Sequence, residues 1–537
     1  MQKKYDVIII GGGVSGLTLG ALLAKAGLTC CIIEKEAQPG GYLAGFKRKG
    51  FHFDTAIHWL NQFNEEGIAH RCFSFIDADY PKPVPMKNIQ RYLSESVDIL
   101  LQTDLDKVKA DFIKSFPEEE KGIRKFFHHA EQLAVASRKM SDFIRSAQTM
   151  NLAEKAVFYP KALPAVFPLI KHLKFEGDEG VNKGLAKYFK GEAIKDIFSS
   201  ESDLLSCLFP LAWAKNKDYF VPPEGGSVTM VNWLMEQNRL LGNNVLLNTP
   251  ATAILTKNNI AQGVEVVHNN ERIRMDSSYV VVASDLIAAY QNMLPSSPVL
   301  KKEIDKLKKA VIYKSAFTVT VALDCPAEDL GFGEELTLLY NNNLERSQHK
   351  SSNPDESMLS VLSSSARDKS VCAKGFGMVS IYMAADIEKY DYWQTELQPD
   401  GSRHRGAAYK TLKEEIARRM FKRVDEALNP DFSKHILFFE AATPFTFYRY
   451  TNNYRGTMMG PRPGKANMQN KVASHFTPVK NLLAGGHWAE LGGGIPTTSR
   501  SAMNTALIIL RKENKKAFKQ LARYFDGKIS LKQLFIQ

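Results

Sequence analysis

The sequence predicts an α/β protein built on a Rossmann-type dinucleotide-binding domain, with an inserted α+β domain. Three observations predict this class: an apolar strand at the N-terminus, a glycine-rich loop directly after it, and a second apolar strand that ends in an acid. With 537 residues, the chain is too long for one ordinary domain.

The first strand and its loop carry most of the prediction. Residues Tyr5–Ile10 are almost all apolar, as expected of a buried parallel strand. The next six residues read GGGVSG, a GxGxxG pattern. Gly11 allows the tight turn, Gly13 lets the backbone approach a pyrophosphate, and Gly16 lets the following helix pack closely on the strand. Helical spacing then runs over Leu17–Ala26.

The start of that helix and the second strand complete the predicted dinucleotide site. Val14 and Ser15 lie at the helix N-terminus, where free N–H groups and the helix dipole attract phosphate. The strand Cys30–Ile33 ends at Glu34, followed by Lys35. A carboxylate at this position accepts hydrogen bonds from ribose hydroxyl groups and repels a 2′-phosphate, which disfavours NADP.

Composition and charge indicate which partners and which cellular compartment suit the chain. The formal net charge is +12, and residues 511–537 contribute half of it, which favours anionic partners such as a membrane surface. The six cysteines form no CxxC pair, so we expect neither a disulfide scaffold nor a metal site, and we expect a cytoplasmic location with peripheral contact to a membrane. The apolar run over 7–24 is broken by the three consecutive glycines at 11–13, so we expect no targeting segment and no transmembrane helix there. We find no nucleic-acid recognition motif.

Two further segments point from a general dinucleotide site to FAD. Gly40 and Gly41 follow Glu34 closely, and a GFHFD segment covers residues 50–54. This pairing resembles flavin enzymes of the glutathione-reductase-like and amine-oxidase-like superfamily, in which the glycine doublet lies along the cofactor. There the doublet is usually followed by Arg and Ser/Thr, whereas Tyr42 follows here, which disfavours a standard amine oxidase.

Later segments resemble the same superfamily. A PPEGGS segment at 222–227 precedes a predicted helix over 228–241, and a buried strand is predicted over 279–283. Near the C-terminus, a strand runs into a turn at Gly485, and a GGGIP run containing Gly494, Ile495 and Pro496 precedes a predicted helix over 498–510. The resemblance implies that this helix N-terminus faces the flavin ring.

The C-terminal third resembles one family within that superfamily. The ATP segment at 442–444, the YRY segment at 448–450 and glycines at 456 and 460 are similar to those of the phytoene desaturase, carotenoid isomerase and retinol saturase family. The resemblance implies non-covalent FAD and a long apolar polyene or isoprenoid substrate. It leaves open the reaction direction (desaturation, saturation or isomerisation) and the electron donor or acceptor. The segment DTAIHW at 54–59 looks closest to the retinol-saturase-like members.

The discontinuous motifs predict a divided chain. We expect residues 1–60, 220–290 and 475–512 to form the FAD-binding domain, and residues 61–219 and 291–474 to form a domain that faces the substrate and the membrane. Residues 513–537 are predicted to form a basic amphipathic C-terminal helix.

The stretch 156–174 combines large apolar side chains with lysines and has no acid. Such a segment suits either the interface of an anionic bilayer or the packed core. Because prolines recur at 160, 164 and 168, we do not expect a regular helix throughout this stretch.

Candidate catalytic residues follow from the family resemblance and from side-chain chemistry. His58 is the first acid/base candidate, because imidazole titrates near neutral pH. His487 and Glu490 flank the C-terminal glycine turn and are further candidates, either for catalysis or for orienting the cofactor. Two alternative functions remain at this point: a flavin amine oxidase, and a non-catalytic prenyl- or lipid-binding escort protein on the same scaffold.

Overall fold

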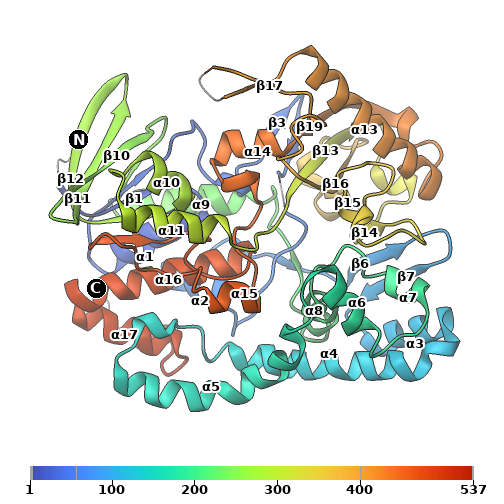
Figure 1. Ribbon diagram of the computed structural model, residues 1–537, viewed down its shortest axis with the longest axis horizontal. Helices are drawn as coiled ribbons and strands as arrows, with labels where there is room; N and C mark the ends of the chain where they lie inside the picture. Colours follow the sequence, from blue (N-terminus) through green and yellow to red (C-terminus); the bar gives the residue numbers. More distant parts are fainter. Residues whose placement is uncertain (1–3, 56, 400–401, 535–537) are drawn as a thin grey trace.

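A computed structural model describes residues 4–55, 57–399 and 402–534. Two large sheets lie at opposite ends of an elongated molecule, and a layer of helices runs along one side (Figure 1). Ala56 of the DTAIHW segment and the last three residues of the predicted C-terminal helix lie outside the described residues.

The first sheet contains the glycine-rich loop. Its strands run in the order β10-β11-β12-β1-β2-β9, and β20 pairs with the second half of β12. Strands β12, β1, β2, β9 and β20 are parallel neighbours, whereas β10 and β11 are antiparallel. The bounds are β1 Lys4–Ile10, β2 Cys30–Ile33, β9 Asn244–Leu246, β10 Ala251–Lys257, β11 Ile260–His268, β12 Glu271–Val282 and β20 Leu482–Ala484. Segments far apart in the sequence therefore meet in one sheet, and the predicted α/β class with its Rossmann-type core is confirmed.

Strand β1 is apolar throughout because both of its faces are covered. Val7 and Ile9 point into a core shared with helices on one face, while Ile8 and Ile10 point into a core on the other. The first core packs against α1 Val14–Lys25, α2 Ile68–Ile76, α9 Val228–Leu240 and α16 Gly494–Glu513. The second is covered by α10 Leu286–Asn292 and α11 Pro298–Lys308.

The second sheet runs in the order β19-β13-β16-β15-β14-β6-β7 and is antiparallel except between β14 and β6. The bounds are β6 Asn88–Leu93, β7 Asp98–Gln102, β13 Ser315–Leu323, β14 Leu336–Leu339, β15 Leu359–Ser363, β16 Gly377–Ala385 and β19 Ile436–Ala442. Helix α13, Ala407–Ala427, packs on one face through Ile416, Met420 and Val424. The other face packs in part on helices from the middle of the chain, through residues such as Tyr92 and Leu336, and in part lines the space between the two sheets.

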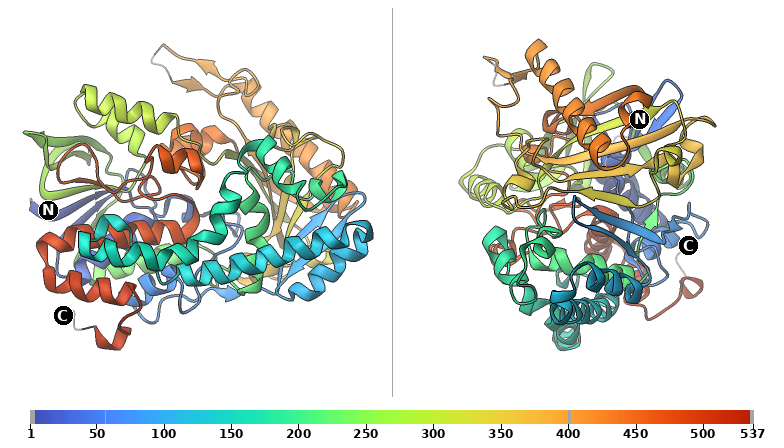
Figure 2. Two further views of the ribbon diagram at one scale, coloured as in Figure 1. Left: turned by 60° about the horizontal axis from the view of Figure 1, so that its bottom comes forward. Right: turned by 90° about the vertical axis from the view of Figure 1, so that its right-hand side faces the viewer.

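Helices from the middle of the chain form the layer along one side, which Figure 2 brings forward. They are α3 Leu105–Ser115, α4 Glu120–Met140, α5 Leu152–Leu173, α6 Gly177–Leu185, α7 Glu192–Asp196 and α8 Leu204–Lys215. The shorter elements include β3 Phe46–Arg48, β4 Phe51–Phe53, β5 Val84–Pro85, β8 Phe220–Val221, α12 Ser364–Arg367, β17 Glu396–Leu397, β18 Arg403–His404, α14 Pro444–Thr451 and α15 Lys465–Gln469.

Helix α5 corrects one sequence-based expectation. It is helical from Leu152 to Leu173 even though Pro160, Pro164 and Pro168 lie inside it. Each proline removes the N–H that would bond the carbonyl group four residues earlier. The prolines are spaced by four, so the freed carbonyls lie along one side of the helix, and Pro160 and Pro164 are exposed. Water can satisfy these carbonyls, which explains why a helix is tolerated here.

The C-terminal helix is basic and amphipathic, as predicted, but it is shorter than the predicted range 513–537. Helix α17, Lys515–Phe525, buries Ala517, Leu521 and Phe525 in the core of the first sheet. Its basic side chains face solvent, and its apolar face is occupied by the protein itself. Among the described residues, no helix is both long enough and apolar enough to cross a membrane.

Candidate functional site

A large cavity of about 1420 Å³ lies between the two sheets. Its walls include the loop after β1, the N-terminus of α16, the inner face of the second sheet and α8. Pockets for single small ligands typically measure about 300–1,000 Å³. The cavity is therefore large enough for a dinucleotide and a second elongated molecule.

The glycines of the loop after β1 have distinct physical roles. Gly11 has a φ of +116°, a conformation that side-chain-bearing residues rarely adopt. A Cβ atom on Gly16 would lie 2.0 Å from the carbonyl oxygen of Gly11, so only glycine lets α1 pack this closely. A Cβ on Gly13 would meet no atom within 4 Å, because Gly13 borders the open cavity. The loop thus presents bare backbone to whatever fills the cavity.

Glu34 lies at the end of β2 and lines the cavity. Its carboxylate accepts hydrogen bonds from the backbone N–H of Gly12 (2.8 Å) and of Glu36 (2.9 Å). These bonds hold the carboxylate beside the glycine loop. Lys35 also lines the cavity rim, where its ammonium donates to the carbonyl of Arg449 at 2.7 Å.

The predicted glycine doublet lies against this loop. The Gly40 N–H donates to the carbonyl of Gly12 at 2.9 Å, and Gly40 and Gly41 both have positive φ angles. A Cβ on Gly40 would approach the Val231 side chain to 2.9 Å. Both glycines line the cavity and extend the exposed backbone surface that begins at Gly11.

A second helix N-terminus faces the same cavity. Helix α16 begins at Gly494, four residues earlier than the sequence predicts, and Gly494, Ile495 and Pro496 all line the cavity. The Ser15 hydroxyl donates to the carbonyls of Gly485 and Thr498, which ties the start of α1 to the start of α16. Two positive helix ends therefore point into one cavity.

Two predicted cofactor residues lie behind the cavity wall. Neither Gly16 nor Gly485 lines the cavity. A Cβ on Gly485 would lie 2.5 Å from the Val281 side chain of β12, so this glycine allows the turn after β20 to pack closely on β12. The side chain of Ser15 is likewise occupied by its bonds to backbone carbonyls.

Asp54 joins two distant motifs. Its buried carboxylate accepts hydrogen bonds from the Ser227 hydroxyl (2.5 Å) and the Ser227 N–H (3.0 Å) at the start of α9. Burial raises the pKa of Asp54, and the bonds from Ser227 oppose that rise. The GFHFD and PPEGGS segments are thus held together at the cavity edge.

His58 lines the cavity, as expected of a candidate catalytic residue. Its ring packs against the edge of Tyr382, with ring centres 4.7 Å apart, and its backbone carbonyl accepts a hydrogen bond from Arg367. Burial, together with the nearby Arg367 charge, lowers the pKa of His58 to about 4. The imidazole is therefore neutral near pH 7 and cannot serve there as a protonated acid.

His487 also lines the cavity, directly after the C-terminal glycine turn. Burial lowers its pKa to about 4, so its ring is neutral as well. Its Nε2 atom is buried and has no hydrogen-bond partner among the described residues. A buried nitrogen of this kind fits a polar group supplied by a bound molecule.

Glu490 has a different environment. It does not line the cavity, and its Oε1 contacts His475 Nε2 (3.0 Å) and Asn504 (2.8 Å). Burial alone would raise its pKa, but Arg500, His475 and Asn504 lower it to about 2. Glu490 is an ionised packing residue, so we do not retain it as a catalytic candidate.

The far part of the cavity combines an apolar wall with a polar group that sequence reasoning missed. The apolar wall comes from α8, β14 and the loop before β15: Leu205, Phe209, Trp213, Leu336, Leu338 and Met358. Beside it lie Glu201, Asp203, Arg462 and Tyr313. Arg462 pairs with Asp203 at 2.8 Å, and its guanidinium lies 4.8 Å from the Tyr313 ring centre.

Glu201 is the titratable member of this polar group. Burial raises its pKa to about 7, with Arg462 opposing the rise and Asp203 adding to it. The residue sits in the short loop before α8, within a run of serines and acids that resembles an ordinary surface turn. Only the fold shows that this turn faces a cavity.

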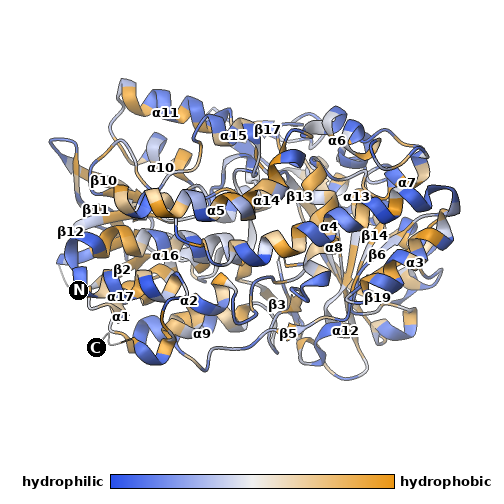
Figure 3. Cartoon of the chain, turned by 90° about the horizontal axis from the view of Figure 1, so that it is seen from below, coloured by the Kyte–Doolittle hydropathy of each residue, from blue (hydrophilic) through white to orange (hydrophobic). Residues whose placement is uncertain are grey.

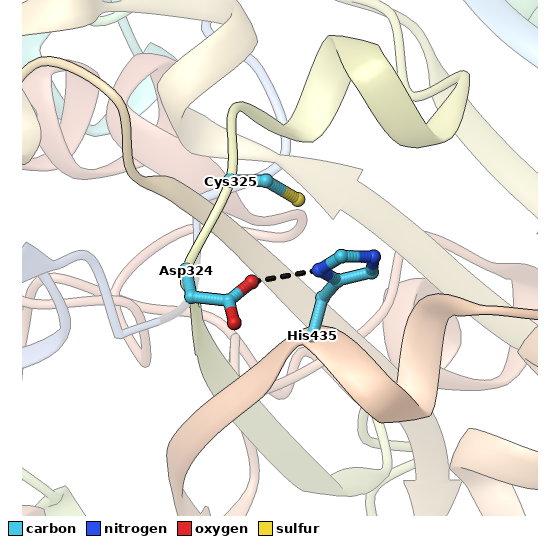
Figure 4. A group of neighbouring side chains, drawn as sticks. All are labelled: Asp324, Cys325 and His435. Atoms are coloured by element: carbon cyan, nitrogen blue, oxygen red, sulfur yellow. Dashed lines mark hydrogen bonds and ion pairs between the residues drawn. The ribbon is translucent and has the colours of Figure 1, made fainter.

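One group of potential metal ligands is present among the described residues: Asp324, Cys325 and His435 (Figure 4). Asp324 Oδ1 contacts His435 Nδ1 at 2.7 Å, so two of the three side chains already pair with each other. The group lies where β13 ends and β19 begins, is partly exposed and does not line the cavity. It plays no part in the site described above.

Comparisons with known proteins agree with this geometry. Residues 9–75 match the family described as NAD(P)-binding Rossmann-like domain. The chain is 23% identical to an all-trans-retinol 13,14-reductase of Danio rerio, over 98% of this chain and 90% of that protein. It is 22% identical to a chloroplastic prolycopene isomerase of Daucus carota, over 86% of this chain and 72% of that protein. The fold is similar to that of cyclohexylamine oxidase from Brevibacterium oxydans, with a TM-score of 0.56, 14% identity, and coverage of 95% of this chain and 99% of the oxidase.

The fold and the site are those of a dinucleotide-dependent oxidoreductase, with a large cavity beside the nucleotide loop. The similarity to the reductase and the isomerase covers most of both chains. It agrees with the resemblance that the sequence predicts, and it supports an oxidoreductase of the type that acts on polyenes. The likeness to the amine oxidase concerns the fold alone.

Proposed function

We propose that the protein binds FAD non-covalently and catalyses redox chemistry at a carbon–carbon bond of a long apolar polyene or isoprenoid. The observation that carries the proposal is the continuity of the cavity, which runs from the bare glycine loop to an apolar wall. Relatives over nearly the whole chain are named for retinol and for prolycopene, two polyenes. We further propose a cytoplasmic location with peripheral membrane contact.

The residues around the loop fit FAD. The backbone at Gly13 and the first N–H groups of α1 would hold the pyrophosphate, and Glu34 would accept from the ribose. The N-terminus of α16 would face the flavin ring and stabilise negative charge on it. A polar atom of the bound cofactor would give the buried His487 Nε2 the hydrogen-bond partner that it lacks among the described residues. When bound, FAD would supply the hydride acceptor or donor that this chain's side chains lack.

The apolar wall defines what the rest of the cavity would hold. Side chains such as Phe209, Trp213 and Leu338 would align an extended hydrocarbon and exclude water from it. A substrate of this type offers few polar groups, which agrees with the scarcity of charged side chains along α8 and β14. The proposed domain division follows: residues 1–60, 220–290 and 475–512 bind the cofactor, and the intervening segments hold the substrate.

Proton transfer is assigned to Glu201 in place of the three residues that the sequence suggests. His58 and His487 are neutral near pH 7, and Glu490 is ionised outside the cavity. A carboxyl group with a pKa of about 7 can both hold and release a proton at that pH. Neutral His58 would then position the chain or a water molecule.

The first test concerns the cofactor. Purified full-length protein should be yellow, or should take up FAD on titration and quench its fluorescence, with much weaker uptake of FMN or NADP. Glu34→Gln should weaken FAD binding by about tenfold, since it removes the ribose-binding charge. Protein that stays colourless and does not bind FAD would contradict the proposal and favour a lipid-escort role.

A further inference from the structure

Helix α5 exposes a large apolar surface. Six of its large hydrophobic side chains are exposed to between 47% and 86%: Leu152, Val157, Tyr159, Leu163, Phe167 and Ile170. Isolated exposed hydrophobic residues are normal, but a concentration of them on one element marks an interaction surface. Leu152 and Phe167, at 86% and 69%, are the two most exposed large hydrophobic residues among those described.

Five of these residues form one stripe along the helix. Leu152, Tyr159, Leu163, Phe167 and Ile170 are separated by seven, four, four and three positions, the spacing of a single helix face. The opposite face packs against the protein body through Ala162, Ala165 and His172. Helix α5 is therefore apolar on both sides, and the outer stripe is not needed to hold it on the protein. Figure 3 views the side of the molecule that α5 crosses, next to α4.

The surroundings of the stripe are basic. Residues 155–174 contain four lysines and no acid. Arg145 contacts both Glu154 at the start of α5 (3.3 Å) and Asp526 just after α17 (3.1 Å), so the two helices meet there. The lysines of α17 face solvent because its apolar face is buried. A positive zone thus adjoins the apolar stripe.

The end of α5 reaches the cavity. His172, Leu173 and the nearby Glu176 line the same cavity that holds the glycine loop. If a lipid bilayer covered this surface, the cavity would lie next to the bilayer. A water-insoluble polyene dissolves in that bilayer. The arrangement links the exposed stripe to the proposed substrate.

We propose that the outer stripe of α5 docks the protein on an anionic lipid bilayer, beside the cavity wall through which the substrate passes. The helix lies in the interface, with the stripe among the acyl chains and the lysines among anionic headgroups. Charge complementarity favours a bilayer over a second copy of this basic chain. The proposal rests on the proposed function only for the identity of the substrate.

The test compares charge-matched variants of the full-length, FAD-loaded protein by co-sedimentation with vesicles. The wild type should bind vesicles that contain phosphatidylserine, bind pure phosphatidylcholine vesicles less, and lose affinity as salt rises. The double variant L163E/F167E should lose about tenfold or more in vesicle affinity. The control variant L240E/V299E, which changes two residues that are each 62% exposed on α9 and α11, should bind as the wild type does.

Three results would overturn the proposal. The wild type could fail to bind vesicles, or L163E/F167E and L240E/V299E could lose the same vesicle affinity. L163E/F167E could also keep its vesicle binding but dissociate an oligomer of the protein. The last result would show that a second copy of the chain covers the stripe. Because glutamates could unfold α5, Phe167→Trp gives a milder check. Its added fluorescence should shift to the blue with vesicles, and an unchanged spectrum would count against docking.

The assay also separates this inference from the proposed function. Both double variants should convert a detergent-dispersed polyene at the wild-type rate, while L163E/F167E alone should be slow with vesicle-embedded polyene. If the wild type converts no dispersed polyene, the proposed function fails, whatever the vesicles show.

Discussion

Gly13 and Gly16 lie three residues apart in the same glycine-rich motif, yet the structure gives them opposite reasons for lacking a side chain. Gly16 is enclosed by the backbone of Gly11, whereas Gly13 borders open space. We therefore expect the fold to require Gly16 and the bound cofactor to require Gly13. This distinction can be measured.

Gly16→Ala should destabilise the protein even without cofactor, because its methyl group would lie 2.0 Å from a backbone oxygen. Overpacking of this kind costs about 1–3 kcal/mol. Gly13→Ala, with a φ of −73°, should leave the Tm of the apoprotein unchanged and weaken FAD binding by about tenfold. Thermal unfolding and FAD titration of both variants check this, and equal losses of Tm would contradict it.

Glu201 should make stability depend on pH. Its pKa is raised in the folded state, so burial disfavours the ionised carboxylate. The folded protein then binds more protons than the unfolded chain between about pH 4.5 and 7, and stability falls as pH rises through that range. Glu201→Gln should therefore raise Tm at pH 8 relative to the wild type and leave it nearly unchanged at pH 4.

If Glu201 transfers the proton, Glu201→Gln should lower the turnover rate. It should also remove the change of turnover rate near pH 7 from the plot of turnover rate against pH. Exposed Glu66 is the matched control, since Glu66→Gln should affect neither profile. A wild-type limb near pH 7 that persists in Glu201→Gln would exclude this role.

At the scale of the elements, the sequence predicts the nucleotide-binding part well and the substrate part poorly. Strand β1, the loop and α1 each carry a local signal, because buried parallel strands are continuously apolar and glycines mark the turn. Glu201 carries none, since an acid in a serine-rich turn gains its raised pKa only from the walls that distant segments build around it. The prediction of an irregular segment at α5 is wrong, because prolines interrupt a helix less strongly where water can reach the carbonyl groups that they leave unbonded.

The proline-containing helix can be tested directly. Pro164→Ala restores an N–H donor on the exposed side of α5, and a proline in a helix interior costs about 3 kcal/mol relative to alanine. The variant should unfold at a higher urea concentration than the wild type. If residues 152–173 were an irregular segment, loss of proline would instead destabilise the protein by freeing the unfolded chain.

At the scale of the whole molecule, one cavity is closed by segments from both ends of the chain. The contact of Ser15 with Gly485 and Thr498 joins residues more than 400 positions apart, and Asp54 reaches Ser227 across another long gap. Folding of the cofactor site therefore requires almost the entire chain. Fragments that end before α16 should fail to bind FAD even though they contain the complete GxGxxG loop, and fluorescence titration of such a fragment checks this.

The central claim is that a flavin in this cavity exchanges a hydride with a carbon–carbon bond of a polyene. The direct measurement is anaerobic mixing of the protein, in its oxidised and its photoreduced form, with retinol, phytoene and lycopene while flavin and polyene absorbance are recorded together. We predict that at least one polyene changes its conjugation as the flavin changes its redox state, in equal amounts. A flavin whose redox state is unchanged by all three polyenes, but which is reduced by a primary amine, would contradict the account.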